Sequence, residues 1–96
     1  MLELWEIILP LQDNAGKPYA HEHSEVCVLL LEAFGGYTSF KANGGWLDGV
    51  TVYEEDVMVY RFLCESEPAI NWLWSLFPDQ KALYVAKVGR GRIVSR

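Results

Sequence analysis

Two histidines separated by one residue form the only cluster in the sequence whose side chains are typical transition-metal ligands. His21 and His23 flank Glu22, and Glu25 follows two residues later. Alternate residues of an extended segment point the same way, and neutral imidazoles bind zinc, copper or nickel. A complete site needs three or four ligands, so the spacing favours a solvated loop before a helix over a metal or acid–base site. We predict neither a bound metal nor another cofactor.

The other residues that could do chemistry form no recognisable catalytic arrangement. Glu54, Glu55 and Asp56 are consecutive acids, but paired catalytic carboxylates must converge in a desolvated pocket, and such a run is more typical of a solvated surface. The sequence defines no Ser-His-Asp or Cys-His arrangement and contains no phosphate-binding glycine loop. We therefore name no catalytic residue and favour a protein that is not an enzyme.

The charges are divided unevenly along the chain. Residues 1–80 hold all thirteen acids and three of the eight cations, a formal charge of −10, whereas residues 81–96 hold five cations and no acid. Arg90, Arg92 and Arg96 suggest a nucleic-acid contact, but no aromatic residue lies among them and the rest of the chain is acidic, so we do not expect one. We expect part of this charge to pair within the domain, and a truncation after Gly89 to leave the fold intact.

Length and composition indicate one domain, residues 1–96. With 51% apolar and 22% charged residues, the chain can bury enough surface to fold. It shows neither a secretory leader nor an apolar run of the ~18–20 residues that span a bilayer, so we expect no membrane association. Cys27 and Cys64 are too few for a disulfide framework, which predicts a cytoplasmic protein with both thiols reduced.

Turn-forming residues divide the chain into six main elements. Ser24 is expected to cap the first helix and Gly35 to end it. Asn43-Gly44-Gly45 is expected to form a tight reversal, and the further glycine at 49 suggests a loop or irregular hairpin through Trp46. The pattern predicts strands over residues 2–9, 37–42, 50–64 and 82–88, and helices over residues 24–34 and 67–77. The strand over residues 50–64 is either one long piece or two. This order predicts an α+β fold, a ferredoxin-like β-α-β-β-α-β sandwich with two helices on one face of a four-stranded antiparallel sheet.

In such a sheet the first strand lies between the third and the fourth, and alternation gives each strand two faces. To the face under the helices we assign Trp5, Ile7, Leu9, Met58, Tyr60, Phe62, Tyr84 and Val88. The opposite face then holds mainly branched aliphatic residues, Leu83 and Val85 among them, together with Glu6, Arg61 and Lys87. These charges are expected either to pair across strands and fix the register, or to form a ligand-binding cluster in an apolar floor.

The predicted second helix is apolar around its whole circumference. Trp72 and Trp74 project from a helix roughly 200° apart, and a monomer of this size cannot easily bury both. One of them is therefore expected to face a partner, a loop or a ligand. Because a large exposed apolar face usually marks an interface, and closed symmetric dimers are the commonest assembly, we predict a homodimer.

A distinctive pattern follows the predicted first helix. Phe34-Gly35-Gly36-Tyr37-Thr38 leads to Gly44-Gly45-Trp46, an aromatic-rich stretch over residues 68–77 and Gln80. These residues resemble a group of small ferredoxin-like proteins that have F-G-G-x-T after the first helix and G-x-W in the following hairpin. The resemblance covers about two-thirds of the chain. It implies a fold and no catalytic residues.

Tyr37, Thr38 and Trp46 are candidate ligand-binding residues, because the second strand and its hairpin form an edge where a pocket could meet the first helix. The alternative is that they pack the hairpin onto the core. The leading hypothesis is a small non-enzymatic, dimeric domain that binds a protein or small molecule through the apolar sheet face or the helix with Trp72 and Trp74. The alternative is a small enzyme or metal-binding protein with a pocket near His21, His23, Tyr37 and Trp46.

Overall fold

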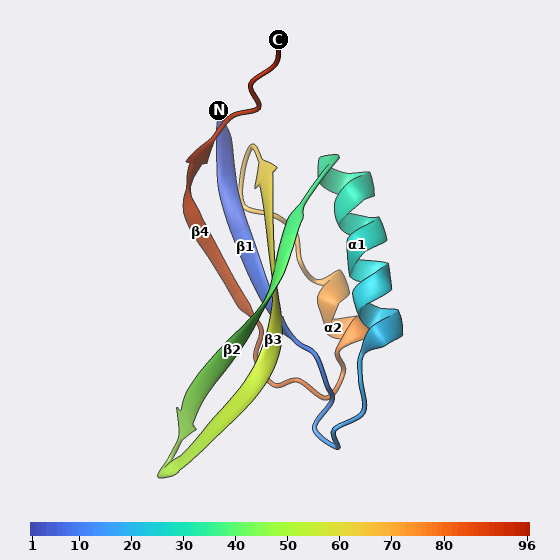
Figure 1. The fold of residues 1–96 in the computed structure, drawn as a ribbon, viewed down its shortest axis with the longest axis vertical. Helices are drawn as coiled ribbons and strands as arrows, with labels where there is room; N and C mark the ends of the chain where they lie inside the picture. Colours follow the sequence, from blue (N-terminus) through green and yellow to red (C-terminus); the bar gives the residue numbers. More distant parts are fainter.

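The computed structural model describes residues 1–96 as one four-stranded antiparallel sheet with two helices on one face (Figure 1). The strands lie in the order β2-β3-β1-β4. The elements are β1 (Leu2–Pro10), α1 (Ala20–Phe34), β2 (Thr38–Asp48), β3 (Thr51–Cys64), α2 (Trp72–Leu76) and β4 (Tyr84–Gly91). The prediction of an α+β fold with a four-stranded antiparallel sheet and two helices is confirmed.

The core lies between the sheet and the helices and follows the alternation of β1 and β3. Trp5, Ile7 and Leu9 lie opposite Phe62, Tyr60 and Met58 in the antiparallel register. Both helices contribute buried side chains to the same cluster, Val26 and Leu30 from α1, and Leu73 and Phe77 from α2 and its end. The assignment of these two strands to a helix-covered face and an open face therefore agrees with the structure.

Helix α1 begins four residues before the predicted start. Ser24 does not cap it, because its hydroxyl donates to the Ala20 carbonyl at 3.1 Å inside the helix. At the other end Gly35 has φ 79° and its amide donates to the Leu31 carbonyl, the left-handed ending expected from a glycine. The earlier start brings His21 and His23 into the helix.

The predicted reversal at residues 43–45 is wrong. Strand β2 continues through these residues, and Gly44 and Gly45 pair with Glu55 and Glu54. The chain reverses instead at Gly49, whose φ of 63° is the left-handed conformation that glycine adopts easily. Residues 43–56, which we call the hairpin arm, extend beyond β1, because β1 pairs with β3 only as far as Pro10 and Val57. The molecule is consequently elongated, with a long axis of 49 Å.

Helix α2 is much shorter than the predicted helix over residues 67–77. Only Trp72–Leu76 are helical, followed by Phe77, whose amide donates to the Leu73 carbonyl at 3.0 Å. Leu73 in the helix and Phe77 directly after it are both buried, four positions apart and on one side. One helical turn is enough to place both in the core, and the residues before Asn71 are therefore free to form an irregular connection.

The predicted faces of β4 are reversed. Val85 lies opposite Ile7 and Lys87 opposite Trp5, so both belong to the helix-covered side. Tyr84 lies opposite Ile8 on the open side, and Val88 is the extra residue at a shift in register. Alternation could not fix this strand's orientation, because the residues from Ala82 to Ala86 are all apolar or aromatic. The strand also reaches Gly91, so a truncation after Gly89 would remove paired residues.

Candidate functional site

The side of the sheet away from the helices, which we call the open face, carries one ion pair. Arg61 Nε lies 2.9 Å from Glu6 Oε2, and the two residues are direct cross-strand partners. The Arg61 guanidinium also lies 5.4 Å from the centre of the Phe40 ring, within range of a cation–π contact. Glu6 and Arg61 thus stabilise the pairing of β1 with β3 while leaving the face electrically neutral at this point.

Lys87 does not join this pair, contrary to the prediction. It lies on the helix-covered side, where its Nζ is 2.6 Å from Glu3 Oε2. Hydrogen bonds from Lys87, and then from the Trp5 indole, hold the pKa of Glu3 below its ordinary value. The error follows directly from the reversed faces of β4.

Apolar side chains form the rest of the four-stranded part of the open face. Val57 and Val59 are buried although no helix covers them, since they lie between cross-strand neighbours on β1 and β2. Around them the face presents Leu4, Ile8, Phe40, Leu63 and Tyr84. Phe40 and Tyr84 are 43% and 51% exposed. A large apolar surface with one internal ion pair is the most unusual surface of the molecule.

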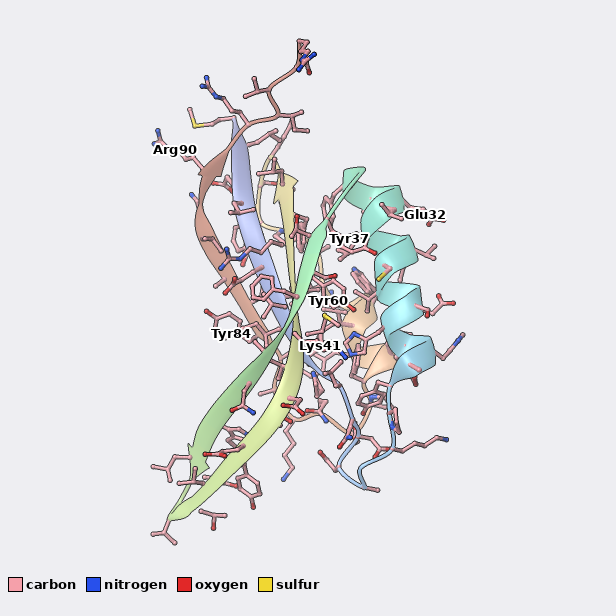
Figure 2. All side chains as sticks on the ribbon, viewed as in Figure 1. Glu32, Tyr37, Lys41, Tyr60, Tyr84 and Arg90 are labelled. Atoms are coloured by element: carbon pink, nitrogen blue, oxygen red, sulfur yellow. The ribbon has the colours of Figure 1, made fainter.

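Tyr37, Thr38 and Trp46 do not share a pocket. Thr38 lies opposite Arg61 on the open face. Tyr37 lies between the sheet and α1, with its ring centre 5.9 Å from that of Tyr60 (Figure 2). Trp46 is far along the hairpin arm and stacks on Tyr53 with ring centres 5.0 Å apart. The first two residues therefore flank opposite faces of the sheet, and the third belongs to the arm.

His21 and His23 also lie apart, because two residues on a helix differ by roughly 200° rather than pointing the same way. His21 is exposed, 4.0 Å from Glu25. The His23 side chain points from α1 toward the sheet, where its Nδ1 is 2.5 Å from the Tyr60 hydroxyl and its Nε2 is 2.8 Å from the Pro10 carbonyl. The prediction of a solvated loop is wrong for both residues, which lie in α1, although His21 is exposed to solvent. No group of three or more His, Cys, Asp or Glu side chains gathers as a metal site in the structure.

The contacts of His23 fix its neutral tautomer. A carbonyl only accepts hydrogen bonds, so Nε2 carries the proton and donates to Pro10, and Nδ1 accepts from the Tyr60 hydroxyl. Burial lowers the pKa of His23, partly offset by the Pro10 hydrogen bond and by Glu22. Burial and the nearby Cys27 thiol raise the pKa of Tyr60. At neutral pH both groups are therefore uncharged. Their hydrogen bonds form a structural connection between α1, β1 and β3.

We expect the free energy of unfolding to decrease as the pH falls from 7 to 5. In the unfolded chain His23 takes up a proton near its ordinary pKa of about 6.5, whereas in the folded chain burial lowers this pKa and the proton binds only at lower pH. The stabilisation that is present above the unfolded pKa is therefore lost on acidification. Urea denaturation at several pH values should show a flatter dependence for His23→Gln than for the wild type. His21→Gln is the control and should keep the wild-type slope. Equal slopes for wild type and His23→Gln would contradict this assignment.

The two tryptophans of α2 differ in their surroundings. Trp72 is partly buried against the core, and its indole N–H donates to the Ala69 carbonyl at 3.0 Å. Trp74 is 43% exposed. Trp74 is therefore the one that is available to a partner or ligand.

An additional polar connection was not predicted. The Tyr19 hydroxyl donates to Asp79 Oδ1, and the backbone N–H of Asn14 donates to Asp79 Oδ2 at 2.8 Å. These bonds join the loop before α1 to the turn after α2. The nearest sequence signal is the turn chemistry of residues 13–16, which predicts a loop but gives no information about its distant partner.

Two surface depressions are open to solvent. One, about 450 Å³, lies at the ends of α1 and β3, where Phe34 and Cys64 meet the loop over residues 65–69. The second, about 420 Å³, is lined by Leu11, Asp56 and three residues of β2. Both cysteines are free. No helix has the length and apolar character needed to cross a bilayer.

Fold and surface together define an α+β domain whose sheet is covered on one side and open on the other. A scan against protein-family models finds no match to the chain, and a search of curated proteins finds no similar sequence.

Proposed function

We propose that the chain is a small, non-enzymatic binding domain that acts as a homodimer, with the open face as its subunit interface. The observation that carries the proposal is the composition of that face. Within its four-stranded part the only charged residues are Glu6 and Arg61, which neutralise each other, although the whole chain has a net charge of −5. The free thiols of Cys27 and Cys64 fit a cytoplasmic location.

The proposed arrangement is ferredoxin-like. The element order β-α-β-β-α-β and the position of β1 between β3 and β4 support it. Helix α2 is the departure, with one turn where a longer helix is usual. A shorter second helix leaves the sheet and its open face unchanged, so the proposed interface does not depend on it.

A second copy of this chain is the occupant that the charges favour. In a two-fold symmetric contact the same surface patch meets itself, so a patch whose charges are neutralised within it brings no net charge against its copy. The Glu6–Arg61 pair meets this condition, because each side chain already has its partner 2.9 Å away. The remaining side chains are apolar and need no specific partner.

The open face is also large enough for a subunit interface when the hairpin arm is included. Four strands about 4.8 Å apart and seven residues of about 3.3 Å each define a plane of roughly 19 × 23 Å. The accessible area of protruding side chains exceeds this flat area of roughly 440 Å², and the hairpin arm adds more. A standard interface buries about 800 Å² per partner, which the face and the arm together can approach.

The enzymatic alternative has less support. Its proposed pocket needed His21, His23, Tyr37 and Trp46 together, but His21 is exposed on α1, His23 and Tyr37 pack between α1 and the sheet, and Trp46 stacks on Tyr53 in the hairpin arm. Both ring nitrogens of His23 are already hydrogen-bonded, which leaves none to accept a substrate proton. A binding role requires no such group.

The dimer is tested by placing charges on the open face. Phe40→Asp combined with Tyr84→Asp should convert the dimer to a monomer, because four unpaired carboxylates would be buried between the two copies. Light scattering at micromolar concentration measures the mass. Val28→Asp is the matched control, since Val28 is a half-exposed apolar residue on α1, and it should leave the dimer intact. A monomeric wild type, or a dimer insensitive to the double substitution, would contradict the proposal.

A further inference from the structure

Two segments at opposite ends of the long axis carry opposite charges. The hairpin arm, residues 43–56, contains Asp48, Glu54, Glu55 and Asp56 and no cation. Residues 90–96, which we call the basic tail, contain Arg90, Arg92 and Arg96 and no acid. The tip of the arm and the C-terminus lie at opposite ends of the long axis (Figure 1), and Arg90 is at the tail's end of β4 (Figure 2).

Both ends also expose apolar side chains that find no cover within one chain. Val50 at the tip of the arm is 98% exposed, and Leu47 and Val52 lie opposite each other beside it. Ile93 and Val94 in the basic tail are similarly exposed. Each end therefore combines one sign of charge with unpaired apolar surface, which is the composition of half an interface.

We propose that the two copies in the dimer run antiparallel, so that the hairpin arm of each packs against the basic tail of its partner. This inference rests on the proposed open-face dimer and specifies its orientation. Two sheets that pack face to face are related by a two-fold axis between them, and aligned packing keeps their strands within about 30° of each other. The long axes of the two copies then run either parallel or antiparallel.

Charge selects the antiparallel arrangement. In a parallel dimer the two acidic arms would lie side by side, and so would the two basic tails, which places like charges together at both ends. In an antiparallel dimer each acidic arm meets a basic tail, at two symmetric places. The part of the uneven charge that does not pair within one chain, as Lys87 does with Glu3, is then neutralised between subunits.

The other acids at the tail's end do not reverse this preference. Glu3 is paired with Lys87. Glu65 and Glu67 belong to the connection from β3 to α2, which lines a depression together with Ala33 and Phe34 of α1. Arg90 lies opposite Glu3 on the helix-covered side of β4, so the contact with the arm is assigned to Arg92 and Arg96, which follow the strand.

One spin label per chain distinguishes the arrangements. Val50→Cys in a Cys27→Ala background places a label at the tip of the arm, with Cys64 buried and unlabelled. In the antiparallel dimer the two tips lie at opposite ends, and pulsed dipolar spectroscopy should give a separation on the order of the 49 Å long axis. In a parallel dimer the tips would lie about 10 Å apart, the spacing of stacked sheets. The Cys27→Ala protein without the new cysteine should take up no label.

The three outcomes separate the two proposals. A long distance supports both. A short distance overturns the antiparallel arrangement and leaves the open-face dimer standing. Absence of any dipolar coupling, with a monomeric mass, overturns the dimer and the orientation together.

Charge reversal provides an independent test. Glu54→Lys with Glu55→Lys should weaken dimerisation roughly tenfold or more at low salt, as should Arg92→Glu with Arg96→Glu, because each turns attraction into repulsion. All four changes in one chain should restore most of the affinity, and high salt should reduce the differences. Sedimentation equilibrium measures each dissociation constant. Additive weakening in the fourfold variant would contradict the arm–tail contact.

Discussion

Replacement of Phe77 by alanine is expected to lower the free energy of unfolding by about 3–5 kcal/mol, the largest effect of any substitution considered. The Phe77 side chain has no exposed surface, and its ring lies edge-on to Tyr19 at 4.8 Å and to His23 at 5.7 Å between ring centres. It is also one of only two fully buried anchors of the α2 region. A domain of this size is stable by about 5–15 kcal/mol in total, so the loss is a large fraction.

Urea denaturation followed by tryptophan fluorescence measures this change, and Trp74→Ala provides the comparison. Trp74 is also large and aromatic and lies three residues away, but it is 43% exposed. Its removal should cost clearly less than that of Phe77. A similar loss for both would indicate that Trp74 is covered in solution, and thus that the structure describes α2 incompletely.

Replacement of Leu30 by alanine should lower the free energy of unfolding by about 2–5 kcal/mol. Leu30 and Val26 are the two side chains of α1 that are fully buried in the core. The cavity left by the missing methyl groups adds to the lost transfer free energy, because the sheet below cannot collapse into it.

Leu31→Ala is a closely matched control, with the same chemical change one position along the same helix. Leu31 is 51% exposed, so its loss should change the free energy of unfolding by less than about 1 kcal/mol. Thermal or urea denaturation of the pair measures the difference. Equal effects would mean that α1 is rotated about its axis relative to the described structure.

The fold could be predicted where alternation and turn chemistry agree. Strands β1 and β3 alternate clearly between apolar and polar residues at Trp5 to Ile7 and at Tyr60 to Phe62, and their faces and the Glu6–Arg61 pairing follow from that pattern. Strand β4 has no such alternation, so its faces depend on contacts with β1 that no local pattern reports. The predicted position of Lys87 was wrong for this reason.

The turn in the hairpin arm was misplaced because turn-forming residues are not always used as turns. Asn43, Gly44 and Gly45 have the composition of a reversal but pair regularly with β3. Pairing over eleven residues outweighs the weak strand preference of two glycines. The turn at Gly49 carries the same kind of signal, and only the partner strand decides between them.

The burial of His23 could have been recognised. It precedes Val26, Cys27 and Leu30 by three, four and seven positions, the spacing of one helical face, so an earlier helix start would have placed it toward the core. The prediction instead began the helix at Ser24 on the strength of its capping side chain. The hydrogen bond to Tyr60 has no local signal, since the two residues are thirty-seven positions apart.

The central position of β1 has a consequence for synthesis on the ribosome. This strand is synthesised before both of its neighbours, β3 and β4, and its last pairing joins Leu2 to Gly91 at the end of β4. Until residues 84–91 leave the exit tunnel, one edge of β1 presents unpaired amides and carbonyls beside the apolar side chains of the core. The nascent chain therefore offers a ready template for β-strand addition until β4 is synthesised, and slow translation would prolong this exposure.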